Sequence, residues 1–104
     1  MTAKDIEASE LATLMKDGKA LLIDVREPNE YAKEHIEGAE SFPLSGFNPL
    51  ALPEPGEREL VFYCAGGIRS AQAVDACGKA GIAYQAHLKG GINAWRARGL
   101  PTVK

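Results

Sequence analysis

Cys64 and Arg69 are separated by four residues, two of them glycines, within the stretch FYCAGGIRS (residues 62–70). A cysteine attacks as its thiolate, and an arginine adds a permanent positive charge whose fork of donors fits a tetrahedral oxyanion. Glycines lack a Cβ and accept positive φ, so the backbone between the two residues is free to curl with several N–H groups aimed at one centre. This spacing predicts an anion-binding loop around a reactive thiol.

The elements on either side of the loop favour the same chemistry. Leu60–Cys64 is an apolar run of strand length, and a pattern of small residues over 70–81 predicts a helix that begins near Arg69 or Ser70. In open α/β sheets, ligands bind outside the carboxyl ends of the strands, and the positive end of the next helix faces the same point. The predicted site has Cys64 as nucleophile and a substrate-binding loop made of Ala65, Gly66, Gly67, Ile68, Arg69 and Ser70.

A purely structural interpretation makes Cys64 a small buried hydrophobe that ends a strand, followed by an ordinary glycine turn. The convergence of the thiol, the glycines, the arginine and a helix start at one edge favours chemistry instead. Cys77 is interpreted as a packing residue on the helix. At 1.5 Å per residue it lies roughly 10 Å along the helix from the loop, too far for a disulfide, so we expect two free thiols.

The rest of the chain predicts one α/β domain spanning residues 1–104. Continuous apolar runs suit parallel strands covered on both faces, and strands that alternate with helical patterns imply βαβ units. We therefore expect an open, mainly parallel sheet of about five strands with helices on both faces. The further elements expected are helices in 9–18, 28–36 and 90–99, the last anchored by Trp95, strands at 20–25, near 41–42 and at 82–88, and a loop over 45–57.

Composition excludes several classes of protein. With 45% hydrophobic and 25% charged residues in a chain of 104, the sequence fits a single globular core. The formal net charge of -2 provides no global positive field for nucleic acid or anionic lipid. The N-terminal segment has no apolar signal region, and no stretch approaches the ~20 apolar residues of a membrane span. We expect a cytoplasmic protein without nucleic-acid or membrane partners.

The sequence contains no motif typical of a cofactor or metal site, so we predict neither. Neither a Walker A sequence nor a Rossmann fingerprint occurs, and there is no C-x-x-C pair. His35, His87 and the two cysteines lack the spacing of a metal site. Both histidines are interpreted as ordinary surface or loop residues, with His35 helping to hold a turn. A base for Cys64 supplied by a distant histidine stays open.

Three blocks of the chain resemble the single-domain rhodaneses, a family of sulfurtransferases. They are LIDVREPNEYAKEHIEGAESFPL (22–44), YCAGGIRS (63–70) and LKGGINAWRARGLP (88–101), and together they are highly specific. Glu34, Glu37 and Ser41 depart from the family's usual residues, but they concern a turn and a surface rather than the loop. The resemblance implies a rhodanese-like domain.

The resemblance also implies a reaction. Cys64 attacks the outer, sulfane sulfur of a donor such as thiosulfate, sulfite leaves, and a thiophilic acceptor (cyanide or a thiol) collects the sulfur from a Cys64 persulfide. Arg69 then holds the oxyanion end of the donor. Asp24 and Arg26 are expected to form a structural pair that supports the site.

Alternatives within related chemistry remain. Phosphatases of the dual-specificity type and arsenate reductases carry five residues between cysteine and arginine, whereas this chain has four, which disfavours them. A carrier that receives persulfide sulfur from one protein and passes it to another uses the same Cys64, so the sequence does not choose between carrier and enzyme. An interaction domain without catalysis is disfavoured because Cys64 is present.

Overall fold

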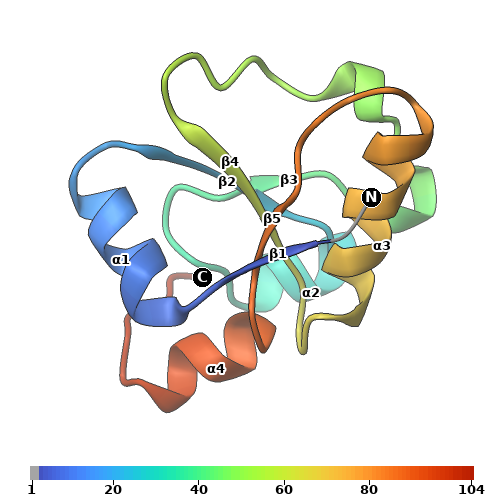
Figure 1. Cartoon of the computed structure of the whole chain (residues 1–104). Coiled ribbons are helices and arrows are strands. Elements are labelled where there is room, and N and C mark those ends of the chain that lie inside the picture. Colours follow the sequence, from blue (N-terminus) through green and yellow to red (C-terminus); the bar gives the residue numbers. More distant parts are fainter. Residues whose placement is uncertain (1–2) are drawn as a thin grey trace.

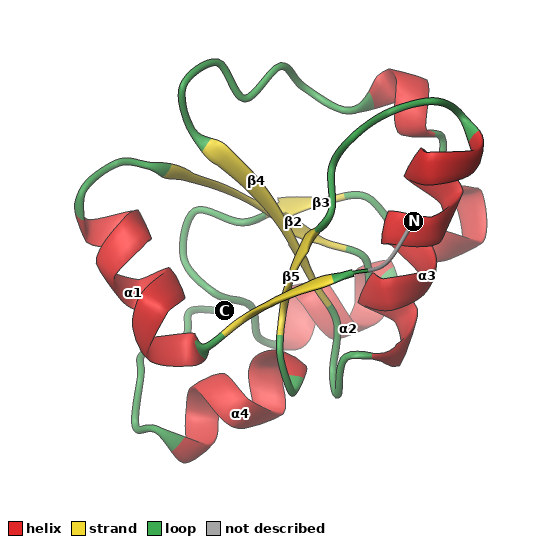
Figure 2. Ribbon diagram, in the orientation of Figure 1, coloured by secondary structure: helices red, strands yellow, loops and turns green. Residues whose placement is uncertain are grey.

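The computed structural model describes residues 3–104, and their centre is a five-stranded parallel sheet. The strands are β1 (Lys4–Ile6), β2 (Ala20–Asp24), β3 (Glu40–Ser41), β4 (Glu59–Tyr63) and β5 (Ala86–Leu88). Their spatial order is β1-β5-β4-β2-β3, with every pairing parallel. Figure 2 shows this sheet at the middle of the molecule. The predicted sheet is confirmed.

Helices cover both faces of the sheet, as the sequence predicted. They are α1 (Ala8–Lys16), α2 (Pro28–Lys33), α3 (Ile68–Lys79) and α4 (Gly91–Ala97), with short 3₁₀ turns at Leu44–Gly46 and Pro49–Ala51. Helices α1 and α4 lie on one side of the sheet and α3 lies on the other (Figure 1). Trp95 of α4 is buried in the core between the sheet and helices α1 and α4, which confirms its packing role.

The two longest strands, β2 and β4, each contain a run of adjacent apolar residues. Leu22 and Val61 belong to the core under α1 and α4, whereas Leu21 and Phe62 belong to the core under α3. Successive side chains of a strand point to opposite faces, and here both faces are covered. The apolar runs are therefore the signature of a sheet buried on both sides.

Strand order places the carboxyl ends of β2 and β4 at a topological switch point. The chain leaves β2 toward β3 on one side and leaves β4 toward β5 on the other, so their connecting segments part above the sheet. Ligands of open α/β sheets bind in the crevice that such a divergence creates. Cys64 is the first residue after β4, and it stands at this point.

Three elements differ from the sequence prediction. Strand β1 was not predicted, because only Ile6 of its three residues is buried. The segment is a strand because it pairs with β5. The strand expected over 82–88 is confined to Ala86–Leu88. Ile82 and Tyr84 pack into the core under α3 while Ala86 and Leu88 lie in the other core, so their alternation did not mark one face.

The third difference is the end of α2. The helix stops at Lys33 instead of reaching residue 36. Glu34 is extended (φ -169°, ψ 135°), which lets His35 form an antiparallel bridge with Val103 near the C-terminus. A tertiary contact therefore overrides the helical pattern.

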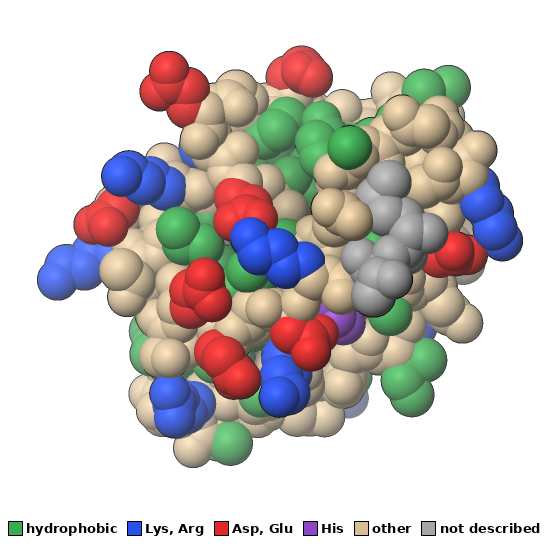
Figure 3. All heavy atoms as spheres, in the orientation of Figure 1, with side chains coloured by type: hydrophobic (Ala, Val, Ile, Leu, Met, Phe, Trp, Pro, Cys, Tyr) green, Lys and Arg blue, Asp and Glu red, His purple; other side chains and the backbone are tan. Residues whose placement is uncertain are grey.

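No helix within residues 3–104 has the length and apolar character that crossing a membrane requires. On the face drawn in Figure 3, basic and acidic side chains are interspersed, with neither sign forming a continuous field. This view agrees with the small net charge of the sequence.

Candidate active site

The sulfur of Cys64 lies inside a turn of backbone amides at the start of α3. The Gly67 N–H donates to Sγ at 3.0 Å and the Ser70 N–H at 3.4 Å. The Ser70 hydroxyl oxygen lies 3.6 Å from the same sulfur. The first turn of α3 thus surrounds the sulfur with hydrogen-bond donors, an arrangement that favours an anion there.

Gly67 makes this turn possible. It caps α3 in the left-handed region, with φ +109°, a conformation that favours glycine. Gly66 has no positive φ, so only the second of the two glycines has the backbone geometry that the sequence suggested for both. A side chain at position 67 would therefore strain the segment that aims its own N–H at the sulfur.

Helix α4 holds the loop from behind. The N–H groups of Ile92 and Asn93 donate to the carbonyls of Cys64 (2.9 Å) and Ala65 (3.1 Å). Gly91 (φ +61°) lies so close that a Cβ built there would be 2.4 Å from both carbonyl oxygens. Because these carbonyls turn toward α4, the amides that follow are left to face the sulfur. Sequence reasoning missed this role, although the Gly90-Gly91 pair was its visible signal.

The electrostatics of the loop act on the Cys64 thiol in opposite directions. Burial raises its pKa, while hydrogen bonds from the Ser70 hydroxyl and from the amides of Ser70, Gly67 and Gly66 lower it; the net result is a pKa below the ordinary value. The residue is only 1% exposed, so the sulfur is buried beneath the loop. The loop can stabilise a thiolate without a neighbouring cation in contact with it.

Arg69 is bound by a residue that the sequence did not single out. Its two terminal nitrogens donate to the carboxylate of Glu30 on α2, at 2.7 and 3.1 Å. This pairing is the main reason why the pKa of Glu30 falls to about 2. Glu30 also accepts from the Glu27 N–H in the capping box of α2. Arg69 is therefore held at the rim of the loop by α2, with both charges partly exposed.

Asp24 and Arg26 form a buried ion pair beside the loop, at the end of β2. Arg26 Nη2 lies 2.7 Å from Asp24 Oδ2 and 2.6 Å from the Glu34 carbonyl. The guanidinium also lies 5.6 Å from the centre of the Tyr63 ring. A buried charge needs such partners, and these contacts tie β2 to the segment after α2.

The two histidines differ from each other and from the prediction. His35 stacks on Tyr31 at 3.8 Å, and its Nδ1 lies 2.8 Å from the Tyr31 carbonyl, which fits the expected role in a turn. The interpretation of His87 as a surface or loop residue is wrong. His87 lies on β5, only 7% exposed, with Nδ1 2.8 Å from the Ser70 hydroxyl. The charged and neutral hydrogen-bond partners around it explain why a polar ring is tolerated there.

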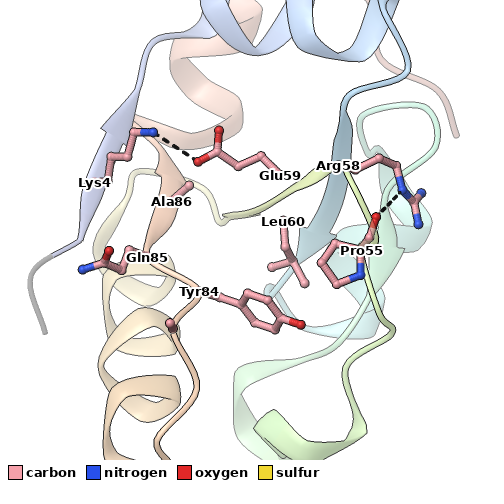
Figure 4. A pocket seen from close by; sticks show the side chains of 9 residues that line it. Lys4, Pro55, Arg58, Glu59, Leu60, Tyr84, Gln85 and Ala86 are labelled. Atoms are coloured by element: carbon pink, nitrogen blue, oxygen red, sulfur yellow. Dashed lines mark hydrogen bonds and ion pairs between the residues drawn. The ribbon is translucent and has the colours of Figure 1, made fainter.

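The remaining features lie apart from the sulfur. The Ile68 side chain, at the loop rim, is 77% exposed. A pocket of about 260 Å³ lies at the opposite, amino-terminal end of the strands, where Lys4, Glu59 and Tyr84 line it (Figure 4). Within residues 3–104, His, Cys, Asp and Glu side chains nowhere gather in a group of three that could hold a metal ion.

Comparison with known proteins gives a consistent family match. Residues 7–98 match the family described as the rhodanese-like domain. A protein from Allochromatium vinosum named sulfurtransferase is 36% identical, and the match covers 95% of this chain and 94% of that protein. A rhodanese-related protein from Thermoplasma volcanium superposes with a TM-score of 0.82 at 29% identity, covering 96% of this chain and 97% of the other.

Other relatives are longer than this chain. The Synechocystis protein slr1261 is 44% identical over 90% of this chain, which spans 52% of that protein. MoeZ of Mycobacterium tuberculosis, named a probable adenylyltransferase/sulfurtransferase, is 42% identical over 94% of this chain, which spans 26% of it. The chain thus spans about half of one relative and a quarter of the other.

Proposed function

Because the chain belongs to the rhodanese-like domain family, we propose that it is a sulfurtransferase that moves a sulfane sulfur from a donor such as thiosulfate to a thiophilic acceptor. The sulfur travels as a persulfide on Cys64. The observation that carries this proposal is the position of Cys64 Sγ, within 3.4 Å of the amide nitrogens of Gly67 and Ser70.

The first half-reaction loads the sulfur. The Cys64 thiolate attacks the outer sulfur of thiosulfate, a new S–S bond forms, and the old S–S bond breaks so that sulfite leaves with its electron pair. A Cys64 persulfide anion remains. The Gly67 and Ser70 amides that stabilise the thiolate also stabilise this anion, because they are already oriented toward the charge.

The second half-reaction discharges the sulfur. Cyanide or a thiolate attacks the outer sulfur of the persulfide, and Cys64 leaves as a thiolate that the loop again stabilises. With cyanide the product is thiocyanate, and with a thiolate it is a new persulfide. Two half-reactions that share one covalent intermediate give ping-pong kinetics.

Arg69 is the candidate group for the sulfonate end of the donor. Its guanidinium stands at the loop rim, bound bidentately to Glu30 in a partly exposed pair. Exposed ion pairs contribute roughly 0 to 1 kcal/mol, so an incoming oxyanion can compete for the guanidinium at low cost. Asp24 and Arg26 support the proposal only indirectly, by fixing the end of β2.

Intact-mass measurement tests the proposal directly. Incubation of the reduced protein with excess thiosulfate should add the mass of one sulfur atom, and cyanide should remove it. Cys64→Ser should prevent the addition. A wild-type mass that stays unchanged in excess donor contradicts the proposed mechanism.

A second candidate is a persulfide carrier that exchanges sulfur with other proteins. The carrier uses the same Cys64, and the Ile68 side chain at the loop rim, 77% exposed, is available for contact with a partner protein. Steady-state turnover separates the two functions. Turnover of thiosulfate and cyanide at roughly 1 s⁻¹ or faster, which is in the usual enzyme range, supports the enzyme. Complete loading of Cys64 by a protein persulfide, combined with thiosulfate turnover far below that rate, supports the carrier.

A further inference from the structure

A chain of hydrogen bonds connects the sulfur of Cys64 to a carboxylate on the surface. Cys64 Sγ lies 3.6 Å from the Ser70 hydroxyl, and that hydroxyl lies 2.8 Å from His87 Nδ1. His87 Nε2 lies 2.8 Å from Asp5 Oδ1. Cys64 directly follows β4, and Ser70, His87 and Asp5 lie in α3, β5 and β1, so the connection exists only in the folded protein.

This chain of hydrogen bonds is buried at Cys64 and Ser70 and reaches solvent only at its far end. Cys64 is 1% exposed and His87 7%, whereas the Asp5 side chain is 58% exposed. A nucleophile that works as a thiolate must lose its proton, and the sulfur has almost no direct contact with solvent. Ser70 and His87 provide a continuous path from the sulfur to water.

One arrangement of protons satisfies every contact in the chain. A carboxylate only accepts hydrogen bonds, so Nε2 of His87 carries the proton that faces Asp5. In the neutral imidazole Nδ1 is then an acceptor, and at 2.8 Å it receives the Ser70 O–H in preference to the Gly67 carbonyl, which lies 3.2 Å from the same hydroxyl. The Ser70 oxygen in turn accepts from the Cys64 S–H. Each group is thus prepared to pass a proton in the same direction, from sulfur to imidazole.

We propose that Ser70 relays the thiol proton of Cys64 to His87, and that Asp5 stabilises the resulting imidazolium. The S–H bond breaks as the Ser70 oxygen takes that proton, and the Ser70 O–H bond breaks as Nδ1 of His87 takes the second one. The products are a thiolate, an unchanged serine and an imidazolium. Ser70 then donates to the thiolate, and its oxygen accepts from Nδ1–H.

The relay rests on the proposed function, because the relay supplies the Cys64 thiolate that attacks the donor. Running in reverse, it returns the proton to the thiolate of the resting protein. His87 acts through Ser70, so it is a positioning residue for the nucleophile. Among residues 3–104, the charged group in contact with His87 is Asp5 on β1. Helix α3 contributes the Ser70 hydroxyl, and the register partner of His87 on β4 is the apolar Phe62. The carboxylate is therefore the charge that favours the imidazolium.

The test follows thiolate formation by its ultraviolet absorbance as a function of pH, in a Cys77→Ala background so that one thiol titrates. His87→Asn keeps a polar amide next to the Ser70 hydroxyl but cannot become a cation. The midpoint should rise by about one pH unit, so that at any pH well below the midpoint the thiolate fraction falls on the order of tenfold. Asp5→Asn removes only the exposed charge, and the fraction should fall about threefold. His35→Asn is the matched control and should leave the midpoint in place.

A merely structural role for His87 predicts a different pattern. Each variant would then lower the melting temperature while the titration midpoint stayed at its wild-type value, and this outcome overturns the relay. Asp5→Asn keeps the test decisive if His87→Asn fails to fold, because the carboxylate is exposed. An unmoved midpoint in Asp5→Asn also counts against the proposal.

Nuclear magnetic resonance of the His87 ring gives the reciprocal readout. A thiolate and an imidazolium stabilise each other, so the ring nitrogen shifts at about pH 7 should show less imidazolium in Cys64→Ala than in the wild type, and an unchanged proportion contradicts the coupling. Neither measurement uses a sulfur donor. A protein that shows the coupled titration yet takes no sulfur from any donor would contradict the proposed function while leaving the relay intact.

Discussion

Cys64 and Cys77 are two thiols in the same apolar core, and they have opposite electrostatic environments. Both are free, both are at most 1% exposed, and both pack with Phe62 and Val74 on the face covered by α3. Burial raises the pKa of Cys77 and nothing offsets it. Burial also raises the pKa of Cys64, but the loop hydrogen bonds outweigh it. Burial alone therefore does not decide whether a cysteine is inert.

The difference comes from the position of each thiol relative to α3. Cys64 lies before the helix, where the first N–H groups have no intrahelical partner and point at the sulfur. Cys77 lies near the other end of the same helix, where N–H groups are already bonded within it. The two thiols are equally buried, so the difference in their pKa shifts reflects the difference between the N-terminus of a helix and its interior.

The largest expected effect comes from breaking the support behind the Cys64 loop. In Gly91→Ala, the new Cβ meets the carbonyls of Cys64 and Ala65 at 2.4 Å and requires a side chain at φ +61°. We expect loss of about 2 kcal/mol of stability and at least a hundredfold loss of sulfur transfer, because small displacements of reacting groups have effects of about this size. Chemical denaturation and transfer kinetics measure both.

Gly99→Ala is the matched control for that substitution. Its φ is +73°, but a Cβ there meets nothing within 4 Å. It should therefore show only the strain of a left-handed residue, about 1 kcal/mol, with transfer unchanged. Equal loss of transfer in both variants would mean that the contact with the loop carbonyls is unimportant.

A smaller effect is expected from the cation at the loop rim, which Cys77 lacks. Arg69→Ala should lower kcat/KM for thiosulfate by roughly thirtyfold, the equivalent of about 2 kcal/mol for a hydrogen bond to a charged group. Melting temperature should change little, since the Glu30 pair is partly exposed. Arg58→Ala, at the opposite end of the sheet, is the control. If the melting temperature falls while kcat/KM holds, Arg69 is structural.

Acid titration should reveal the Glu30 partner of that cation. The folded-state pKa of Glu30 is about 2, below the ordinary 4.5, so the unfolded chain binds more protons between these values. The stability that the pair contributes is complete above pH 4.5 and is lost as pH falls toward 2. After allowance for solvent screening we expect about 1 kcal/mol. The difference in stability between wild type and Glu30→Gln should shrink over this window; a constant difference would disagree.

The smallest effect on activity is expected at the second thiol. Cys77→Ala removes a sulfur from the core under α3 but leaves the loop amides in place. Transfer should stay within about twofold of wild type, and stability should fall by about 1 kcal/mol from the small cavity. A large loss of transfer at unchanged stability would show that Cys77 takes part in the reaction.

The local parts of the site could be predicted from the sequence. Apolar runs indicated β2 and β4, and the spacing from Cys64 to Arg69 indicated the loop, because strand burial and loop curvature are properties of neighbouring residues. The partners that complete the site come from far along the chain. Glu30, Gly91 and His87 meet the loop from α2, α4 and β5. Glu30 and His87 are residue types too common to carry a signal alone, and Gly91 was visible in the sequence only as part of the Gly90-Gly91 pair.

The same limit explains the errors in the fold. Strand β1 has two exposed charged residues, Lys4 and Asp5, and it becomes a strand because β5 offers a free edge. His87 looked like a surface residue because histidine is polar, yet Ser70 and Asp5 satisfy both of its nitrogens. Strand pairing and hydrogen bonds between distant segments determine the structure at these residues, and the pattern of neighbouring residues in the sequence does not reveal such contacts.

Peptide mapping of the sulfur-loaded protein compares the two thiols most directly. After incubation with thiosulfate and trapping of persulfides by alkylation, tandem mass spectrometry assigns the added sulfur to the peptide of Cys64 or to that of Cys77. The loop amides around Cys64 predict the added sulfur on Cys64 alone, with Cys77 unmodified. Added sulfur on Cys77, or equal amounts on both, would contradict the claim that the orientation of backbone amides, rather than burial, sets the reactivity of these cysteines.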